Sequence, residues 1–500
     1  MGKRLLIACC LGALCMFALP SIAADEGDAV VGGPEKTAKS GEGGEAPQRD
    51  LSIDATALYG QYHEILWSGS LAQSFRNFSY ALESGFNRSD DYGIRNTGFY
   101  DHELSFRGDA RASKWRFTPE IEVGNGGRGM FRNPFFDRED RDRVGVKCGA
   151  EYRPMPMRWT FDAGGVYFRH RLDSSRFHDV RTLRPYRSSD LYGATLGIGT
   201  EYVWSAANRL AFTSNFSHYR YSRRAGDDTF VDNELTWNFN LAGFLKFGIG
   251  PLYSYNRDAG HFVSGKAAIS TINIKYFFAE ASYRYELEPF RPEKYYWDER
   301  FVLPNYRLKP GRGHRTEAAV GLDVSREGTG KAYFRSLRMK ISGSFMTRDR
   351  YHSLFPLPEM VRYPHRMKLA EAGAAGEASL EFAIPHGRIE TGGKYEYSYF
   401  YADGYVTYRP EHGGGAFLRI EIWRFETDFN LLYRGPVNAC PFARVRMDRA
   451  FIGSLVLQCR IHDSLYLQGR IDNLFDARYS EVYGYPEPGR TFLGGIRVIL

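Results

Sequence analysis

The stretch RVGVKCGAEYR, Arg143–Arg153, alternates between two kinds of side chain. Its even-numbered residues are aliphatic, aromatic or cysteine, and its odd-numbered residues are charged or glycine. Successive side chains of a β-strand point to opposite faces, so this pattern predicts a strand with one apolar and one polar face. Phe451–Ile461 and Leu337–Phe345 repeat the pattern, which indicates that the same kind of strand recurs along the chain.

Segments of this kind follow one another from residue 51 to residue 500, about 22 in all. Their connections alternate in length, since short ones such as 154–156 are followed by long ones such as 125–141, 170–189, 289–313 and 348–366. Outer-membrane barrels have short periplasmic turns, long extracellular loops and an even number of strands. A soluble β-sandwich is disfavoured because the alternation continues for about 450 residues without a domain break. The predicted fold is all-β, a transmembrane antiparallel β-barrel of outer-membrane type.

The N-terminal residues have the pattern of an export signal. A short basic segment precedes the uncharged apolar run Leu5–Leu19, and small residues stand before Asp25. This order predicts a secretory signal peptide over residues 1–24. Residues 25–50 are rich in Gly, Glu, Ala and Lys, which predicts a flexible periplasmic tail. The barrel is then expected to occupy residues 51–500.

The composition fits an exported β-protein. The chain contains 34 Tyr, 36 Phe and 53 Gly. Beyond residue 24, no apolar run approaches the ~18 residues that a spanning helix needs. Cys148, Cys440 and Cys459 lie beyond the predicted signal peptide, and their spacing suggests neither a disulfide framework nor a CxxC site. A net charge of only +7 predicts no nucleic-acid partner.

No catalytic chemistry is predicted from the motifs. The histidines are scattered without ligand spacing, and neither G-x-S-x-G nor H-E-x-x-H occurs. We therefore expect no enzyme activity, no cofactor and no metal site. Carboxylates at Asp137, Glu139, Asp140 and Asp142 suggest calcium, but arginines interleave with them, which favours ion pairs within the segment.

The residues before the last strand resemble the C-terminal signature of TonB-dependent outer-membrane receptors. The matching residues are Asn473, Leu474, Phe475, Asp476, Tyr479, Gly484, Tyr485, Pro488, Gly489 and Arg490. Tyr395–Tyr399 and Arg409–His412 are similar to a late hairpin of that family, and Val482–Tyr485 resembles its vitamin-B12 and siderophore receptor branch. Leu500 departs from the usual terminal Phe but still ends an apolar face.

The resemblance also implies a globular plug between signal peptide and barrel, and only residues 25–50 stand there. The lumen is then filled by a separate polypeptide or by loops, or it is an open diffusion pore, or the chain is a truncated relic. Asp28, Ala29, Val30 and Val31 are similar to the TonB box, a segment that pairs with TonB as an added strand.

Three outer connections carry the candidate ligand contacts. The candidates are Arg132, Phe135 and Phe136, then Arg176 and Arg181, then Tyr295, Tyr296 and Trp297. Exposed aromatics suit a flat or chelated ligand, and the alternative is that the loops pack on one another. The arginines of 170–189 are expected to meet lipopolysaccharide phosphates, with an anionic ligand as the alternative.

The sequence thus predicts a TonB-dependent-receptor-like barrel that takes up a scarce ligand, such as a siderophore or cobalamin, across the outer membrane. Its plug is missing or supplied separately. A passive, porin-like pore for small hydrophilic solutes and a non-transporting scaffold or adhesin are the alternatives. The expected partners are outer-membrane lipid and lipopolysaccharide, the β-barrel assembly machinery, and TonB or a separate plug protein.

Overall fold

A computed structural model describes most of the chain beyond residue 49. The described residues are 50–91, 97–130, 133, 136–173, 188–221, 227–241, 243–272, 274–288, 310–326, 333–356, 362–440 and 445–500. The predicted signal peptide and the predicted TonB box (Asp28–Val31) lie outside these ranges. So do the candidate contacts Arg132, Phe135, Arg176, Arg181, Tyr295, Tyr296 and Trp297.

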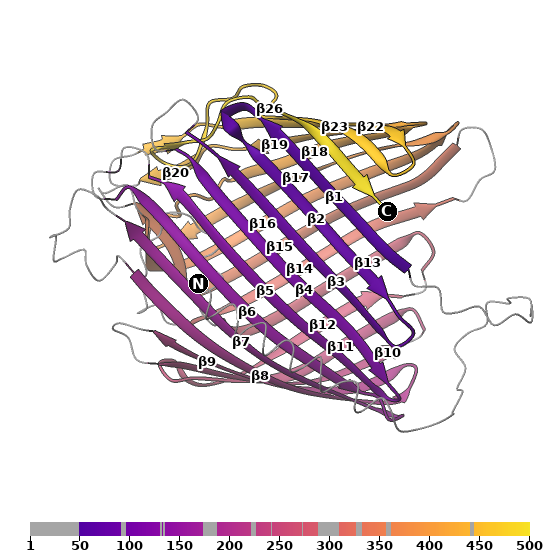
Figure 1. Cartoon of the computed structure of the whole chain (residues 1–500). Helices are drawn as coiled ribbons and strands as arrows, with labels where there is room; N and C mark the ends of the chain where they lie inside the picture. The colour runs from indigo at the N-terminus through magenta and orange to yellow at the C-terminus, as the bar shows by residue number, and fades with distance from the viewer. Residues whose placement is uncertain are drawn as a thin grey trace, which may run out of the picture.

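Twenty-two strands form one antiparallel sheet (Figure 1). They are β1 (Asp50–Gly60), β2 (Ile65–Ser74), β3 (Phe78–Ser89), β4 (Phe99–Ala112), β5 (Trp115–Gly129), β6 (Arg138–Tyr152), β7 (Met157–Asp173), β8 (Ser188–Ser205), β9 (Asn208–Tyr221), β10 (Asp228–Leu241), β11 (Leu245–Asn256), β12 (Gly260–Thr271), β13 (Phe277–Glu288), β14 (Gly311–Ser325), β15 (Tyr333–Pro356), β16 (Arg362–Ile384), β17 (Gly387–Ala402), β18 (His412–Ile422), β19 (Phe425–Arg434), β22 (Ala450–His462), β23 (Leu465–Asp472) and β26 (Thr491–Ile499). Each strand pairs with the next, and β26 pairs with β1, so the sheet closes on itself.

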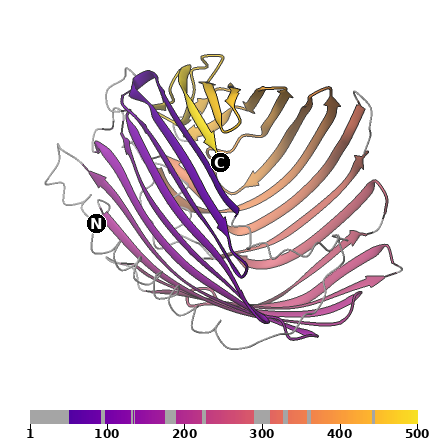
Figure 2. The ribbon, with the colours of Figure 1, turned by 45° about the vertical axis from the view of Figure 1, so that its right-hand side comes forward.

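The seam between β26 and β1 joins the last strand of the sheet to the first. The backbone of Leu500 exchanges two hydrogen bonds with Ile53, each 2.8 Å long. The guanidinium of Arg497 makes a two-pronged contact with the Asp54 carboxylate, at 3.0 and 2.6 Å. Closure matters because lipid offers no hydrogen-bond partners to an open sheet edge. The first and last strands lie side by side in both ribbon views (Figure 2).

The predicted number and positions of the strands are confirmed, but several long loops were overestimated. Residues 348–366 were expected to be a loop, whereas β15 and β16 run through most of that range and reach 24 and 23 residues. Likewise β5 and β6 shorten the expected loop 125–141 to 130–137. Backbone pairing continues past the point where apolar alternation ends, because hydrogen bonding does not require an apolar face.

Two small hairpins lie outside the barrel wall, in connections between its strands. One pairs β20 (Val437–Cys440) with β21 (Val445–Met447), and the other pairs β24 (Ser480–Val482) with β25 (Tyr485–Pro486). Both stand at the end of the barrel that carries the connections 130–137, 174–187, 289–310 and 473–490, which we call the loop rim. The opposite end, with turns such as 385–386 and 463–464, is the turn rim.

The outer face is apolar, as the alternation predicted. The side chains of Phe492, Ile496 and Leu500 on the closing segment are all about half exposed, on the face opposite Arg497. Val263 and Ile341 are exposed by 72% and 66% on the same outer face. Such large apolar surfaces are unfavourable in water and stable against lipid. Within the described residues, the structure contains no helix long and apolar enough to cross a membrane.

Candidate lumen site

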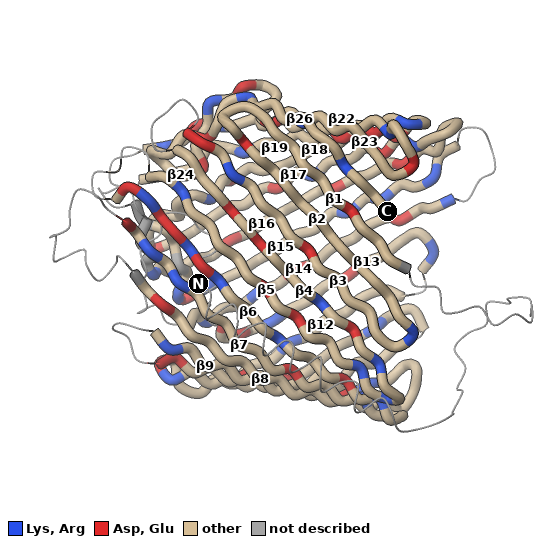
Figure 3. Tube along the Cα trace, in the orientation of Figure 1, with Lys and Arg blue, Asp and Glu red and all other residues tan. Residues whose placement is uncertain are grey.

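Charged residues of both signs are distributed along the strands of the barrel (Figure 3), and many of them pair across neighbouring strands. On one wall, Glu120 accepts bonds from Arg107 at 2.8 Å and from Lys147 at 3.5 Å. On the next row of the same wall, Arg143 donates to Glu122 at 3.0 Å. Because the cross-strand partners in a sheet stand side by side, opposite charges on adjacent strands stabilise each other. The polar faces recognised in the sequence therefore become a continuous charged lining.

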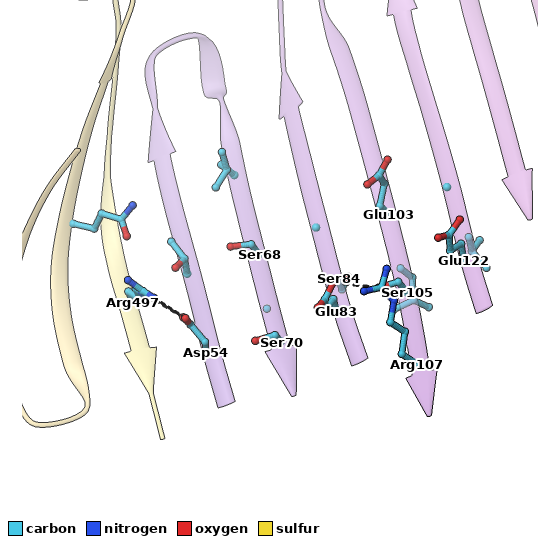
Figure 4. Close-up of a pocket in the computed structure, with 18 of the residues that line it drawn as sticks. Asp54, Ser68, Ser70, Glu83, Ser84, Glu103, Ser105, Arg107, Glu122 and Arg497 are labelled. Atoms are coloured by element: carbon cyan, nitrogen blue, oxygen red, sulfur yellow. Dashed lines mark hydrogen bonds and ion pairs between the residues drawn. The ribbon is translucent and has the colours of Figure 1, made fainter. Parts of the chain in front are cut away.

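One hollow in this lining has a volume of about 760 Å³ and lies between β1–β6 and the closing strands (Figure 4). Serines, glycines, glutamates and arginines surround it, and they include Ser68, Ser70, Glu83, Ser84, Glu103, Ser105, Glu122, Arg143, Gln458, Arg470 and Arg497. The serines and glycines leave space between the longer charged side chains. The hollow therefore presents hydroxyl, carboxylate and guanidinium groups to whatever occupies the lumen.

Three glutamates, Glu83, Glu103 and Glu122, place carboxylates in this hollow. The strand register places Glu83 opposite Ser105, and Ser105 opposite Glu122, while Glu103 lies one row further towards the loop rim. The Ser105 hydroxyl donates to Glu83 at 3.4 Å. Glu103 has no hydrogen-bond or ion-pair partner among the described residues. These carboxylates can accept hydrogen bonds from a hydroxyl-rich or cationic group.

A second hollow of about 690 Å³ lies on the wall formed by β12–β17. Here Lys340 approaches Glu280 at 3.2 Å, and Lys394 pairs with Glu396 on its own strand. At the loop-rim end of this wall, the Arg409 guanidinium donates two hydrogen bonds to the Glu371 carboxylate, of 2.8 and 2.9 Å. Both walls thus carry paired charges rather than a single sign of charge.

Among the described residues, no group of three or more His, Cys, Asp or Glu side chains is placed to hold a metal ion.

Close to the loop rim, between the 3₁₀ turn Gln61–His63 and β2, Glu64 is nearly buried. Burial raises the pKa of Glu64, and the nearby Asp472 carboxylate raises it further.

The acidic segment that suggested calcium lies mostly in β6, and its carboxylates pair with neighbouring basic groups. Asp140 accepts bonds from Arg138 at 2.8 Å and from Arg171 at 2.9 Å. Glu139 lies 2.8 Å from Nε2 of His170, with both side chains only 1% exposed. The expectation of pairing within the segment is confirmed for Arg138 and Asp140, and β7 supplies the other two partners.

The structure corrects the expectation for Phe136. Its side chain is 2% exposed, so it is buried instead of being presented to a ligand. The Phe136 backbone N–H donates to the Asn133 side chain at 2.9 Å, and Asn133 in turn donates to the Tyr485 hydroxyl at 3.1 Å. This contact joins the connection 130–137 to the closing connection 473–490. At this place, packing of one loop on another is what the structure shows.

The terminal motif has a structural role in the described residues. Asn473 is buried and has a φ of 49°, in the left-handed region. Its side-chain nitrogen donates to the carbonyls of Ala477 and Pro488, and its side-chain oxygen accepts from the Ala477 N–H. Arg490 N–H donates to Asp476 at 2.9 Å. Asn473 thus links the beginning and the end of the connection that leads into the closing strand through hydrogen bonds.

Leu474 and Phe475 fold back over the outer face of β22. Leu474 N–H donates to the Gly453 carbonyl at 2.8 Å. A Cβ on Gly453 would lie 2.7 Å from the Phe475 ring. Tyr479 receives the Arg434 guanidinium 5.9 Å from its ring centre, and Gly484 turns the small hairpin with a φ of 86°. These residues shape the connection that leads into β26.

The lumen-wall residues were not among the candidate contacts predicted from the sequence. The signal was present in the alternating strands, whose polar faces already contained residues such as Arg143, Lys147 and Gln458. Glu83, Glu103 and Glu122 stand on separate strands, and only the register shows that they meet. The serines among them are also inconspicuous in the sequence.

Solved structures with a similar barrel are outer-membrane receptors and transporters. The chain superposes on the copper transporter OprC with a TM-score of 0.67 and 14% identity, over 92% of this chain and 82% of that one. A variant of the ferric enterobactin receptor PfeA from Pseudomonas aeruginosa gives 0.67 and 11%, over 91% and 81%. The FrpB iron transporter from Neisseria meningitidis gives 0.67 and 11%, over 92% and 82%.

These comparisons concern the fold, because the identities are low. The protein is an outer-membrane-type barrel of 22 strands, with the fold of the TonB-dependent receptors that its closing residues resemble. No protein-family model and no curated protein sequence matches the chain. The activity must therefore be argued from the lumen itself.

Proposed function

We propose that this protein takes up a scarce ligand, such as a siderophore or cobalamin, through its lumen and across the outer membrane. The observation that carries the proposal is the charged, serine-bearing lumen wall in a barrel whose fold is that of named metal and siderophore transporters. Hydroxyl and carboxylate groups on the wall match the many polar groups of a chelated or glycosylated ligand.

A barrel of 22 strands encloses a lumen that related folds fill with protein. In the described part of the chain, residues form the wall, its turns and two small hairpins, and none forms a globular body inside the lumen. We infer that a separate plug polypeptide occupies it, and that TonB engages Asp28–Val31. Arg176, Arg181, Tyr295, Tyr296 and Trp297 remain the predicted ligand contacts at the loop rim, together with Arg132 and Phe135.

A passive pore is the second candidate, and the same wide lumen favours it. The wall carries both signs of charge, so such a pore would admit small hydrophilic solutes with little preference for anions or cations. The two functions differ in whether a protein fills the lumen in the native membrane.

Single-channel recording in planar bilayers separates the two functions. We expect the protein isolated from its native outer membrane in mild detergent to be silent, because its lumen is filled. The same chain, refolded alone from inclusion bodies, should then show a large, stable conductance. Equal large conductances from both preparations would establish the passive pore and overturn the uptake proposal. Silence of both would place the occupant within this chain.

Energy dependence gives a second test of uptake. Transport that requires TonB stops when the inner-membrane proton gradient is collapsed, whereas diffusion through a pore continues. We therefore expect cells that carry the protein to take up iron-loaded siderophore or cobalamin only without a protonophore. Deleting residues 28–31 should have the same effect as the protonophore while leaving the barrel in the membrane. Uptake that persists under both conditions would contradict a role for TonB.

A further inference from the structure

One arrangement of side chains recurs three times on the outer face near the loop rim. In each case a Tyr-x-Tyr sequence on one strand faces a histidine on the next. The three groups are Tyr253, Tyr255 and His261, then Tyr283, Tyr285 and His314, then Tyr395, Tyr397 and His412. The second tyrosine is directly opposite the histidine in the strand register in all three. We call these groups the Tyr–His modules.

The contacts within the modules are nearly identical. The first tyrosine hydroxyl lies 2.7, 2.8 and 2.6 Å from Nδ1 of the histidine, in chain order. The ring of the second tyrosine lies 4.9, 4.2 and 5.0 Å from the imidazole, measured between ring centres. Tyr59 and His63 repeat the hydroxyl contact at 2.7 Å on the first hairpin.

The position of the modules is as regular as their geometry. Each histidine lies within the first four residues of its strand, beside a connection of the loop rim. It faces outward, on the same side as exposed apolar residues further along the strand, such as Val263 and Val320. The modules therefore stand where the apolar band ends and polar headgroups begin.

The tyrosine determines what the histidine offers to its surroundings. When the phenol donates to Nδ1 of a neutral imidazole, Nε2 carries the proton and becomes a donor. In the protonated ring both nitrogens are donors, so Nε2 still carries its proton. Within the described residues, Nε2 of His261, His314 and His412 makes no hydrogen bond. In both of these states each module presents an outward donor held in place by two tyrosines; in the remaining neutral tautomer Nδ1–H donates to the phenol and Nε2 is an acceptor.

Two cations stand on β16, between the second and third modules and closer to the loop rim, because Tyr397 lies opposite Ala374 and both cations precede that residue on β16. Arg366 and Lys368 are exposed and lie on the face opposite the buried Met367 and Leu369. Neither side chain has an ion-pair partner in the described part of the chain, although the Lys368 backbone N–H donates to the acidic Asp403. Free cations and fixed donors at the headgroup level favour an anionic partner.

We propose that the Tyr–His modules and these two cations bind the phosphate groups of a phosphorylated glycolipid in the outer leaflet. Phosphate oxygens accept hydrogen bonds from the Nε2–H groups and from the two cations, while the acyl chains lie against the apolar band below. The site differs from the lumen and from the arginine-bearing connection 170–189. It depends on the membrane position of this face and does not depend on the proposed transport.

The test measures lipid binding to the full-length, detergent-solubilised protein by native mass spectrometry. The probes are bisphosphorylated lipid A, its dephosphorylated form, and inorganic phosphate. The test variant is H261F/H314F/H412F, which keeps an aromatic ring on each tyrosine but removes the nitrogens. The matched control is H386F/H462F, which removes two histidines at the turn rim. A second variant, R366Q/K368Q, removes the cations without touching the modules.

We expect the wild type and the turn-rim control to retain bisphosphorylated lipid A, and the dephosphorylated form to bind more weakly. The triple histidine variant should bind the phosphorylated lipid about 2- to 10-fold more weakly per site, as expected for one lost hydrogen bond. The cation variant should weaken the same binding. Equal binding of the two lipid forms would overturn the proposal. Full binding of bisphosphorylated lipid A by both variants would also overturn it. So would displacement of that lipid by inorganic phosphate at low millimolar concentration.

Discussion

Gly495→Ala is expected to prevent closure of the barrel. Gly495 lies on β26 opposite Leu58 in the seam with β1. A Cβ built at this position would lie 1.9 Å from the carbonyl oxygen of Ala57, a backbone atom that cannot rotate away. The strands must separate to accept even a methyl group. Because an open edge in lipid leaves backbone groups unpaired at several kcal/mol each, the seam should fail.

The adjacent glycine provides a matched control for this prediction. A Cβ on Gly494 would meet nothing within 4 Å, because this position faces outward. The measurement is the amount of heat-modifiable, folded barrel in outer-membrane fractions on unboiled gels. We expect Gly494→Ala to match the wild type and Gly495→Ala to lose most of the folded form. Equal folded amounts for both variants would show that the seam adjusts without cost.

Asn473→Ala is expected to release the closing connection while the barrel remains folded. The substitution removes three hydrogen bonds of the Asn473 side chain and places alanine at a φ of 49°. At about 0.5–1.5 kcal/mol for each bond, the local cost is about 2–4 kcal/mol. Hydrogen–deuterium exchange of residues 473–490 should therefore become much faster, with little change in the strands.

A second substitution separates the two causes of this effect. Asn473→Gly also loses the side-chain hydrogen bonds, but glycine adopts positive φ without strain. It should be milder than Asn473→Ala by about 1 kcal/mol. If Asn473→Ala leaves exchange in 473–490 unchanged, then the connection is held by other contacts, such as the bond from Asn133 to Tyr485.

Strand positions could be predicted well because a two-faced wall imposes a period of two on every strand. The segment Arg143–Arg153 shows this, since its polar face lines the lumen and its apolar face looks outward. Strand ends at the loop rim were harder to predict. Beyond the membrane the outer face has no need to be apolar, so β15 and β16 continue without the pattern that marks them.

The candidate site was predicted less well than the fold. Aromatic and basic loop residues attracted attention because they are conspicuous in a sequence, yet Phe136 proved to be buried against its own connection. The lumen glutamates and the Tyr–His modules each combine residues from different strands. Their partners are fixed by register, and a shift of one residue would send each side chain to the other face.

The sequence by itself determined that this protein is a closed membrane barrel of 22 strands, because alternation, strand length and strand number are all local properties. The residues before the last strand also carried the resemblance to TonB-dependent receptors. Only the tertiary structure decided which charges meet in the lumen, how Asn473 links the ends of the connection that leads into the closing strand, and that three distant hairpins present the same Tyr–His contact. These features depend on which residues face each other across neighbouring strands. The pairing of strands in the closed barrel fixes those neighbours, and the order of residues along any one strand does not show them.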